Sequence, residues 1–202
     1  MSILPFRRRA VGAAAAAALA LALSACASKP PQTFDLTAPA KLTRSSKFAG
    51  NLIVAEPVAV ATLDGQRVVV KPTAGEVTYL GNAQWSDRLP KLVQAKIIEA
   101  YENSSRLTSV GRPGDRLTVD YQLISELRAF EIDAASGQAV VELTAKVIDD
   151  KSGKIVAGGV FSARRPVPQP IEGLGATRAL DEALGEVLRE LVSWSGATRG
   201  GV

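Results

Sequence analysis

The pattern of apolar and polar residues along the chain predicts a series of strands. Six β-rich runs bounded by turn residues are the candidates: 51–60, 67–71, 76–80, 116–132, 139–149 and 154–163. The fourth run also alternates in part between apolar and polar positions. Pro57 predicts an edge or a break halfway along the first run, and Gly81-Asn82 is expected to end the third. The last three runs are separated by Ser136-Gly137 and by residues 150–153, so they predict an antiparallel meander joined by hairpins.

Two other segments repeat apolar residues every three or four positions, as amphipathic helices do. The first is expected to be capped by Ser86-Asp87, with Pro90 in its first turn. The second is expected to run from about Gly173 or Ala176 to Trp194.

The order of these elements predicts the fold class. Prolines at 166, 168 and 170 make an extended connection between the last strand and the last helix. We therefore expect an α+β, two-layer domain, in which two long amphipathic helices pack on a mostly antiparallel sheet of about six strands. Trp85 and Trp194 each lie at a helix end and are expected to complete the core rather than line a binding site.

The first 25 residues have the three parts of an export signal. Arg7, Arg8 and Arg9 precede an apolar run over 10–23, and small residues at 24–25 stand directly before Cys26. The run is shorter than the ~20 apolar residues of a spanning helix. Cys26 is the only cysteine, so it can form no internal disulfide, and its position resembles the lipobox of bacterial lipoproteins. The alternative is an ordinary secretory cleavage site that is followed by a cysteine.

This interpretation divides the chain into four parts. Residues 1–25 are the signal peptide, 26–46 the lipidated N-terminus and a flexible tether, 47–196 the folded domain and 197–202 a flexible tail. Regular structure is expected to begin near Asn51.

The charge of the chain bears on the kind of partner it can have. The chain has 24 basic and 20 acidic residues, but cleavage of the signal would remove three arginines and no acidic residue, leaving a net charge near +1. With aromatic residues at 5%, this balance does not indicate a nucleic-acid partner.

The residue types also exclude most catalytic chemistry. Without histidine and with one cysteine, the chain cannot form His-based nucleophile systems or His- or thiolate-based metal sites. Glu126, Glu131, Asp133 and Glu142 could supply a carboxylate pair, although charges on strands and turns usually face water. The Asp149-Asp150 doublet is expected to cap a hairpin turn. An enzyme that uses only carboxylates and hydroxyls stays open as an alternative at this point, and no cofactor or metal is expected.

Features along the mature chain resemble the ABC-type transport auxiliary lipoproteins, which accompany Mce- and Pqi-type lipid transport systems. The residues that carry the resemblance are Cys26, Phe34-Asp35-Leu36, Leu52-Ile53-Val54 with Glu56-Pro57, residues 66–70, Tyr79, Trp85, and Leu191-Val192-Ser193-Trp194. The resemblance implies a non-enzymatic envelope lipoprotein with acyl chains on Cys26.

The resemblance also implies partners and a location. They are the membrane itself, the substrate-binding Mce-domain component and, indirectly, the permease and ATPase of a system that moves phospholipid or another hydrophobic molecule between membranes. Ala27 and Ser28, rather than an inner-membrane retention signal, follow Cys26, which favours the outer membrane, facing the periplasm. The domain could act by docking a partner or by holding lipid in an apolar groove. The alternative function is an outer-membrane assembly or scaffold lipoprotein that stabilises a β-barrel or envelope complex.

Overall fold

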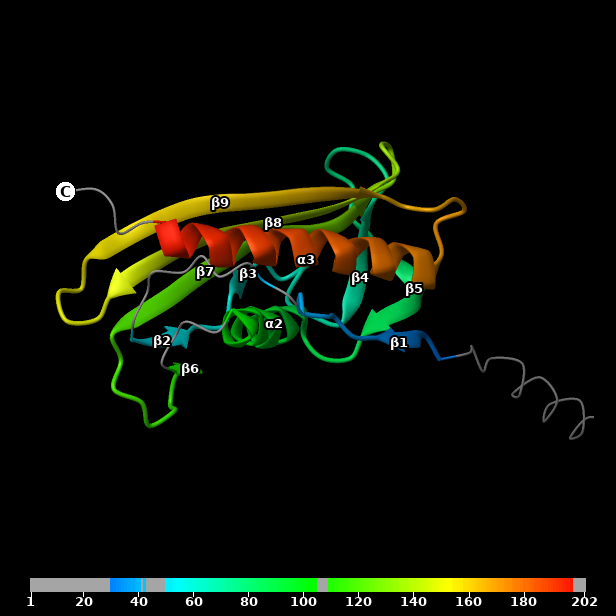
Figure 1. Cartoon of the computed structure of the whole chain (residues 1–202). Helices are drawn as coiled ribbons and strands as arrows, with labels where there is room; N and C mark the ends of the chain where they lie inside the picture. The colour runs from blue at the N-terminus through cyan, green and yellow to red at the C-terminus, as the bar shows by residue number, and fades with distance from the viewer. Residues whose placement is uncertain (1–29, 41, 43–49, 105–108, 198–202) are drawn as a thin grey trace, which may run out of the picture. The chain divides into compact units, whose positions relative to one another are not determined.

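Three long antiparallel strands form the largest part of the sheet (Figure 1). The computed structural model describes residues 30–40, 42, 50–104 and 109–197. The three strands are β7 (Tyr121–Asp133), β8 (Gln138–Asp149) and β9 (Ile155–Pro166). Gly137 and Gly153 in their connecting turns have φ angles of 66° and 65°, which glycine adopts without steric cost. The predicted meander and both of its turns are confirmed.

β7 joins this meander to a set of shorter strands. These are β2 (Asn51–Val54), β3 (Val58–Ala59), β4 (Arg67–Lys71), β5 (Thr78–Trp85), β1 (Gln32–Phe34) and β6 (Ser109–Gly111). β2, β3 and β4 pair with β7 in parallel, β5 pairs antiparallel with β4, and β1 and β6 add parallel edges to β5 and β2. The sheet is therefore mixed, with its longest pairings antiparallel.

All six predicted runs contain strands, with some changes in their bounds. Pro57 breaks the first run into β2 and β3, as predicted, and β1 and β6 are additional strands of three residues each. β5 does not end at Leu80, because β1 pairs with it through residues 83–85 and extends the ladder. β7 begins at Tyr121 rather than at 116, and β9 continues to Pro166.

The two predicted helices are α2 (Leu89–Asn103) and α3 (Gly173–Ala197). Pro90 lies in the first turn of α2, as predicted, but the predicted cap is wrong: the N-cap residue is Arg88, which makes no side-chain capping bond. The Ser86 hydroxyl instead bonds the Asp35 carboxylate at 3.3 Å, because the N-terminal segment packs beside it.

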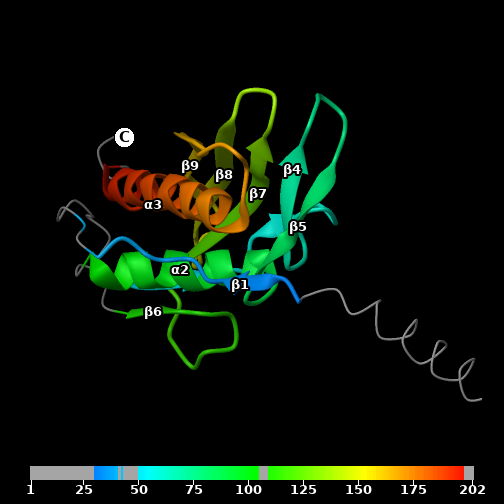
Figure 2. The ribbon, with the colours of Figure 1, turned by 90° about the vertical axis from the view of Figure 1, so that its right-hand side faces the viewer.

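Both helices cover the same face of the sheet (Figure 2). The core lies between them and the inward-facing residues of β8, which are Ala139, Val141, Leu143, Ala145 and Val147. Trp85 is buried and meets Phe130 edge to face at 5.6 Å between ring centroids. Trp194 is half-buried against Phe161, with ring centroids 5.1 Å apart. The prediction of a core role is confirmed for Trp85, whereas Trp194 lies at the margin of the core.

The expectation that regular structure begins near Asn51 is wrong, because part of the predicted tether packs on the domain. β1 extends the sheet, and Leu36 is only 1% exposed. Thr37 is hydrogen-bonded to Asp181 of α3. Apolar residues such as Leu36 supply enough buried surface to hold this short segment in place.

Candidate functional site

The predicted lipidation site, Cys26, lies outside the described residues, as do the signal peptide and residues 198–202 of the predicted tail. Within the described ranges, no helix is long and apolar enough to span a membrane. The same ranges contain no cluster of three acidic, histidine or cysteine side chains that could hold a metal ion.

The side of the β7–β9 meander that faces away from α2 and α3 carries a mixed apolar and charged surface. We call this surface the open face and define it by Val58, Ile124, Glu126, Thr144, Lys146 and Val160. Its apolar members are unusually accessible: Val58 is 69% exposed, Val160 56% and Ile124 37%. Strand alternation explains this arrangement, because Leu123, Leu143 and Phe161 point to the helices and their neighbours point away.

Strand register brings the open face together from four strands. Val58 of β3 lies opposite Glu126 of β7, Glu126 opposite Thr144 of β8, and Thr144 opposite Val160 of β9. A shallow hollow of about 230 Å³ lies among five of these side chains, bounded also by Ser125 and Ala145. Its volume is below the range of pockets that enclose small-molecule ligands, about 300–1,000 Å³.

Charged pairs border the open face. Arg128 of β7 contacts Glu142 of β8 at 3.0 Å, and Lys71 of β4 contacts Glu131 of β7 at 2.7 Å. The second pair lines a polar hollow of about 290 Å³ together with Asp133 and Arg164. Two basic and two acidic side chains share this hollow, so their charges balance.

The four carboxylates considered for catalysis have other surroundings. Glu131 and Glu142 lie in the ion pairs just described, and Glu126 is exposed on the open face. The Ser136 hydroxyl and amide donate to Asp133, and this lowers the pKa of Asp133, with a smaller contribution from the charge of Arg164. The hydrogen bonds to Asp133 stabilise its ionised form, whereas a general acid needs a raised pKa.

Within the Asp149-Asp150 doublet, Asp149 has the capping role that its sequence context predicted. Asp149 accepts hydrogen bonds from the hydroxyl and the amide of Ser152, each at 2.8 Å, and these bonds lower its pKa. Asp150 accepts a bond from the Gln122 side chain at 2.5 Å. Asp149 thus caps the β8–β9 turn, whereas Asp150 ties that turn to β7.

β9 borders the open face and is an edge strand. It pairs with β8 alone, and no strand in the described part of the chain lies along its other edge. Ile155 is 59% exposed and Val156 43%, while charged residues and proline, which commonly protect edges, occur only at 164–166. The backbone groups along most of β9 are therefore a template on which another extended segment could pair.

The model of the family described as ABC-type transport auxiliary lipoprotein component matches residues 34–192. The chain belongs to this family. The match begins at the last residue of β1 and ends within α3, so it includes α2 and all of β2 to β9 in full. Membership places the chain among the auxiliary lipoprotein components of ABC-type transport.

Two solved structures share the fold. Protein XCC0632 from Xanthomonas campestris is 27% identical with a TM-score of 0.75, and the match covers 83% of this chain and 96% of that one. A second structure is 12% identical with a TM-score of 0.65, covers 81% and 97% of the two chains, and shows the fold alone.

A relative in Bradyrhizobium diazoefficiens, protein bll6063, is longer. It is 34% identical over 166 residues, which cover 81% of this chain and 44% of the relative. The chain thus spans less than half the length of this relative.

Sequence reasoning did not find the open face. The strand predicted over 116–132 was not divided into two faces along its length, so Ile124 was not distinguished from its buried neighbours. The structure gives the reason: the β7–β8 register shifts between Leu127 and Ala129, where a bulge interrupts the period of two. The signal in the sequence was Val160, an apolar residue that lies between Gly159 and Phe161 and therefore points to the opposite face of the strand from them.

Proposed function

We propose that acyl chains on Cys26 hold the protein at the outer membrane, facing the periplasm, and that its domain docks the membrane-attached Mce-domain component of an ABC transporter. That system would move phospholipid or another hydrophobic molecule between the inner and outer membranes. The permease and ATPase would be indirect partners. Two or three acyl chains give a stable anchor, since each buried methylene contributes roughly 0.8 kcal/mol.

The observation that carries the docking role is the open face beside the free edge of β9. Exposed apolar side chains from β3, β7 and β9 gather around Glu126 and Lys146, within a border of ion pairs. Protein interfaces have this composition, with apolar residues at the centre and polar residues at the rim. An extended segment of the partner could pair with β9 while its side chains contact Val160.

Cavity volume favours docking over the carriage of lipid. The hollow on the open face holds about 230 Å³, which is less than a drug-sized ligand occupies. On the other side of the sheet, the space between β8 and α3 is filled by residues such as Leu143, Leu184 and Leu188, each 0% exposed. These features support a role in contacting protein rather than in enclosing phospholipid.

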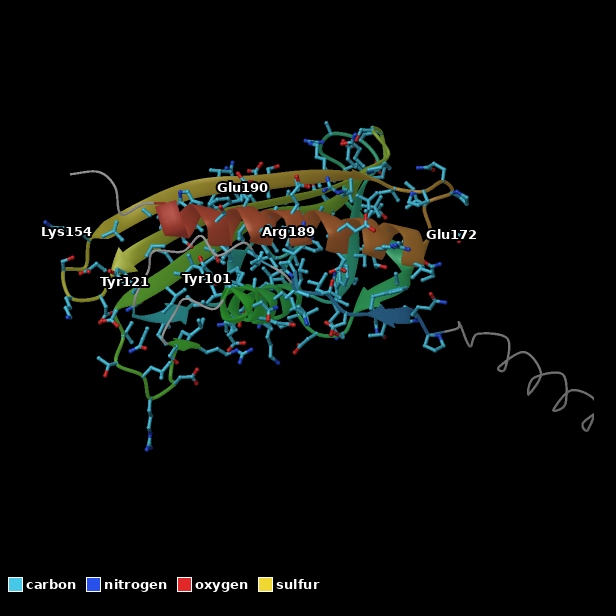
Figure 3. All side chains as sticks on the ribbon, in the orientation of Figure 1. Tyr101, Tyr121, Lys154, Glu172, Arg189 and Glu190 are labelled. Carbon is cyan, nitrogen blue, oxygen red and sulfur yellow. The ribbon has the colours of Figure 1, made fainter. Side chains whose placement is uncertain are left out.

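The test is affinity capture from detergent-solubilised envelopes, read by mass spectrometry, with the wild-type chain and two variants. Val160→Lys places a charge on the open face, whereas Glu190→Gln changes net charge by the same amount at an exposed residue of α3 (Figure 3), in the layer of helices on the other side of the sheet. We expect the wild type and Glu190→Gln to recover the Mce-domain component, and Val160→Lys to lose it while keeping its melting temperature.

Other outcomes of the capture would count against the proposal. Recovery of no transport component, or equal recovery by both variants, contradicts docking through the open face. Recovery of an outer-membrane β-barrel in place of a transport component would support the scaffold alternative.

A further inference from the structure

One end of the domain gathers the start of β1, the middle of β5 and the start of α3. Gln32 lies opposite Ala83, and a Cβ added to Gly173 would lie 3.2 Å from the Ala83 Cβ and 3.5 Å from Phe34 Cε2. We call this the proximal end and define it by Gln32, Phe34, Ala83, Gly173 and Leu174. Figure 3 shows Glu172, next to it, at the opposite side of the domain from Lys154 in the β8–β9 turn.

The length of chain before β1 limits how far the proximal end can be from a membrane anchor. Six Cα-to-Cα steps separate Cys26 from Gln32, so they reach at most about 20 Å. β1 is fixed to β5 by strand pairing, and Leu36 just after it is buried. Acyl chains on Cys26 would therefore keep the proximal end within about 20 Å of the bilayer.

The domain is longer than this reach. α3 has 25 residues and is about 37 Å long at 1.5 Å per residue. It begins at the proximal end and runs toward the end that carries the β8–β9 turn (Figure 1). The two ends therefore differ in distance from the anchor, unless the domain lies flat on the lipid.

Leu174 distinguishes the proximal end chemically. It is 67% exposed and begins the solvent-facing stripe of α3, which continues with Arg178 and Glu182. The next two members of the stripe are charged and form an ion pair with each other, so an exposed leucine at its start interrupts a polar pattern. An apolar side chain held close to a bilayer gains free energy by entering the headgroup and acyl boundary.

We propose that the proximal end rests on the lipid surface in which Cys26 is anchored, with Leu174 entering the headgroup layer and α3 directed away from the membrane. This orientation rests on the proposed lipidation of Cys26. It projects the β8–β9 turn into the periplasm and leaves the open face along the side of the domain, accessible to a partner. A single leucine does not hold a protein on a bilayer, but it biases the orientation of one that is already anchored.

The absence of any other cysteine makes the orientation measurable. In the lipidated full-length protein the thiol of Cys26 is blocked, so Leu174→Cys, Arg178→Cys and Lys154→Cys can each be spin-labelled at one position. The proteins are reconstituted in vesicles of phosphatidylethanolamine and phosphatidylglycerol that contain no other protein. Flotation reports attachment, and collision with oxygen or with a water-soluble nickel chelate reports the depth of each label.

We expect all three proteins to float, and the label at 174 to collide more with oxygen and less with nickel than the label at 178. The label at 154 should be as accessible to the nickel chelate as a label that is fully exposed to water. If the proteins float but the labels at 174 and 154 are both fully accessible to nickel, the orientation is overturned and the anchor is not. If both labels are shielded from nickel to the same degree, the domain lies flat on the lipid, and the orientation is again overturned. Failure of the full-length proteins, which retain Cys26, to float contradicts the anchor itself, and with it the orientation.

Discussion

The carboxylate of Asp181 accepts two hydrogen bonds from Thr37, one from its amide at 2.7 Å and one from its hydroxyl at 2.6 Å, across 144 residues of sequence. This contact ties the segment after β1 to α3. Together with β1 pairing and the burial of Leu36, it leaves only the few residues before Gln32 between the packed domain and the proposed anchor. The position of the domain near the membrane therefore depends on how firmly this segment stays attached.

Asp181→Ala should release that segment without unfolding the domain. The two bonds are solvent-exposed, so we expect a loss of about 1 kcal/mol in the free energy of unfolding and a fall in melting temperature of about 2–4 °C. Hydrogen exchange should rise over residues 32–39 and stay unchanged in β8. Glu182→Ala, which removes an exposed ion pair with Arg178, is the control and should leave exchange at 32–39 as in the wild type. Equal exchange in both variants would contradict the role of Asp181.

Two adjacent glycines of β9 should respond differently to alanine. A Cβ at Gly159 would lie 2.8 Å from Phe161 Cζ and 3.3 Å from Trp194 Cε2, whereas one at Gly158 would lie 3.9 Å from Lys146 Cγ. Gly159→Ala should therefore displace the Phe161–Trp194 pair, lower the free energy of unfolding by about 1–3 kcal/mol and shift tryptophan emission to longer wavelength. Gly158→Ala should leave emission unchanged. Denaturant unfolding followed by fluorescence measures both effects, and similar losses in the two variants would refute this explanation.

The sequence was sufficient for the elements that have a long regular pattern. Alternation over β8 and the helical repeat of α3 predicted both correctly, because each buries one continuous face. The α+β class followed from their order. The predicted break at Pro57 was also right, since proline has no amide hydrogen for the ladder.

Features that depend on distant contacts could not be predicted. β1 has three residues and is a strand only because β5 lies beside it, and β5 in turn continues past Gly81-Asn82 because β1 pairs there. The predicted cap failed for the same reason, since Ser86 bonds Asp35 from the N-terminal segment. The open face required the register of four strands, which no single stretch of sequence contains.

Buried Tyr101 predicts how the domain responds to alkali. Burial raises its pKa to about 12, and the neighbouring Ser195 hydroxyl lowers it only in part. A tyrosine in the unfolded chain loses its proton near pH 10, so between about pH 10 and 12 the unfolded state binds fewer protons and stability falls. The contribution of Tyr101 to the free energy of unfolding is fully present below about pH 10. About 3 kcal/mol of stability is lost as the pH rises through about 12.

Tyr101→Phe should therefore flatten the loss of stability above pH 10 and change little at pH 7. Urea unfolding at a series of pH values measures the slope. Tyr79→Phe is a matched control, because Tyr79 is only partly buried, beneath the Arg67 guanidinium. A slope that is the same in wild type and Tyr101→Phe would show that the Tyr101 hydroxyl is accessible to solvent in the native state.

If Cys26 carries the anchor, membrane attachment and the folding of the domain depend on different parts of the chain. Cys26 precedes the compact unit that begins at Pro31, so Cys26→Ser should remove the acyl chains without altering the packed domain. Because one exposed leucine gives little membrane affinity by itself, we expect the variant to move from the membrane fraction to the soluble periplasm, with an unchanged melting temperature. Arg178→Ser, a serine substitution on exposed α3, should stay with the membranes. Intact mass of the purified wild type decides the chemistry, since an unmodified thiol on Cys26 would refute lipidation even if the protein sediments with membranes.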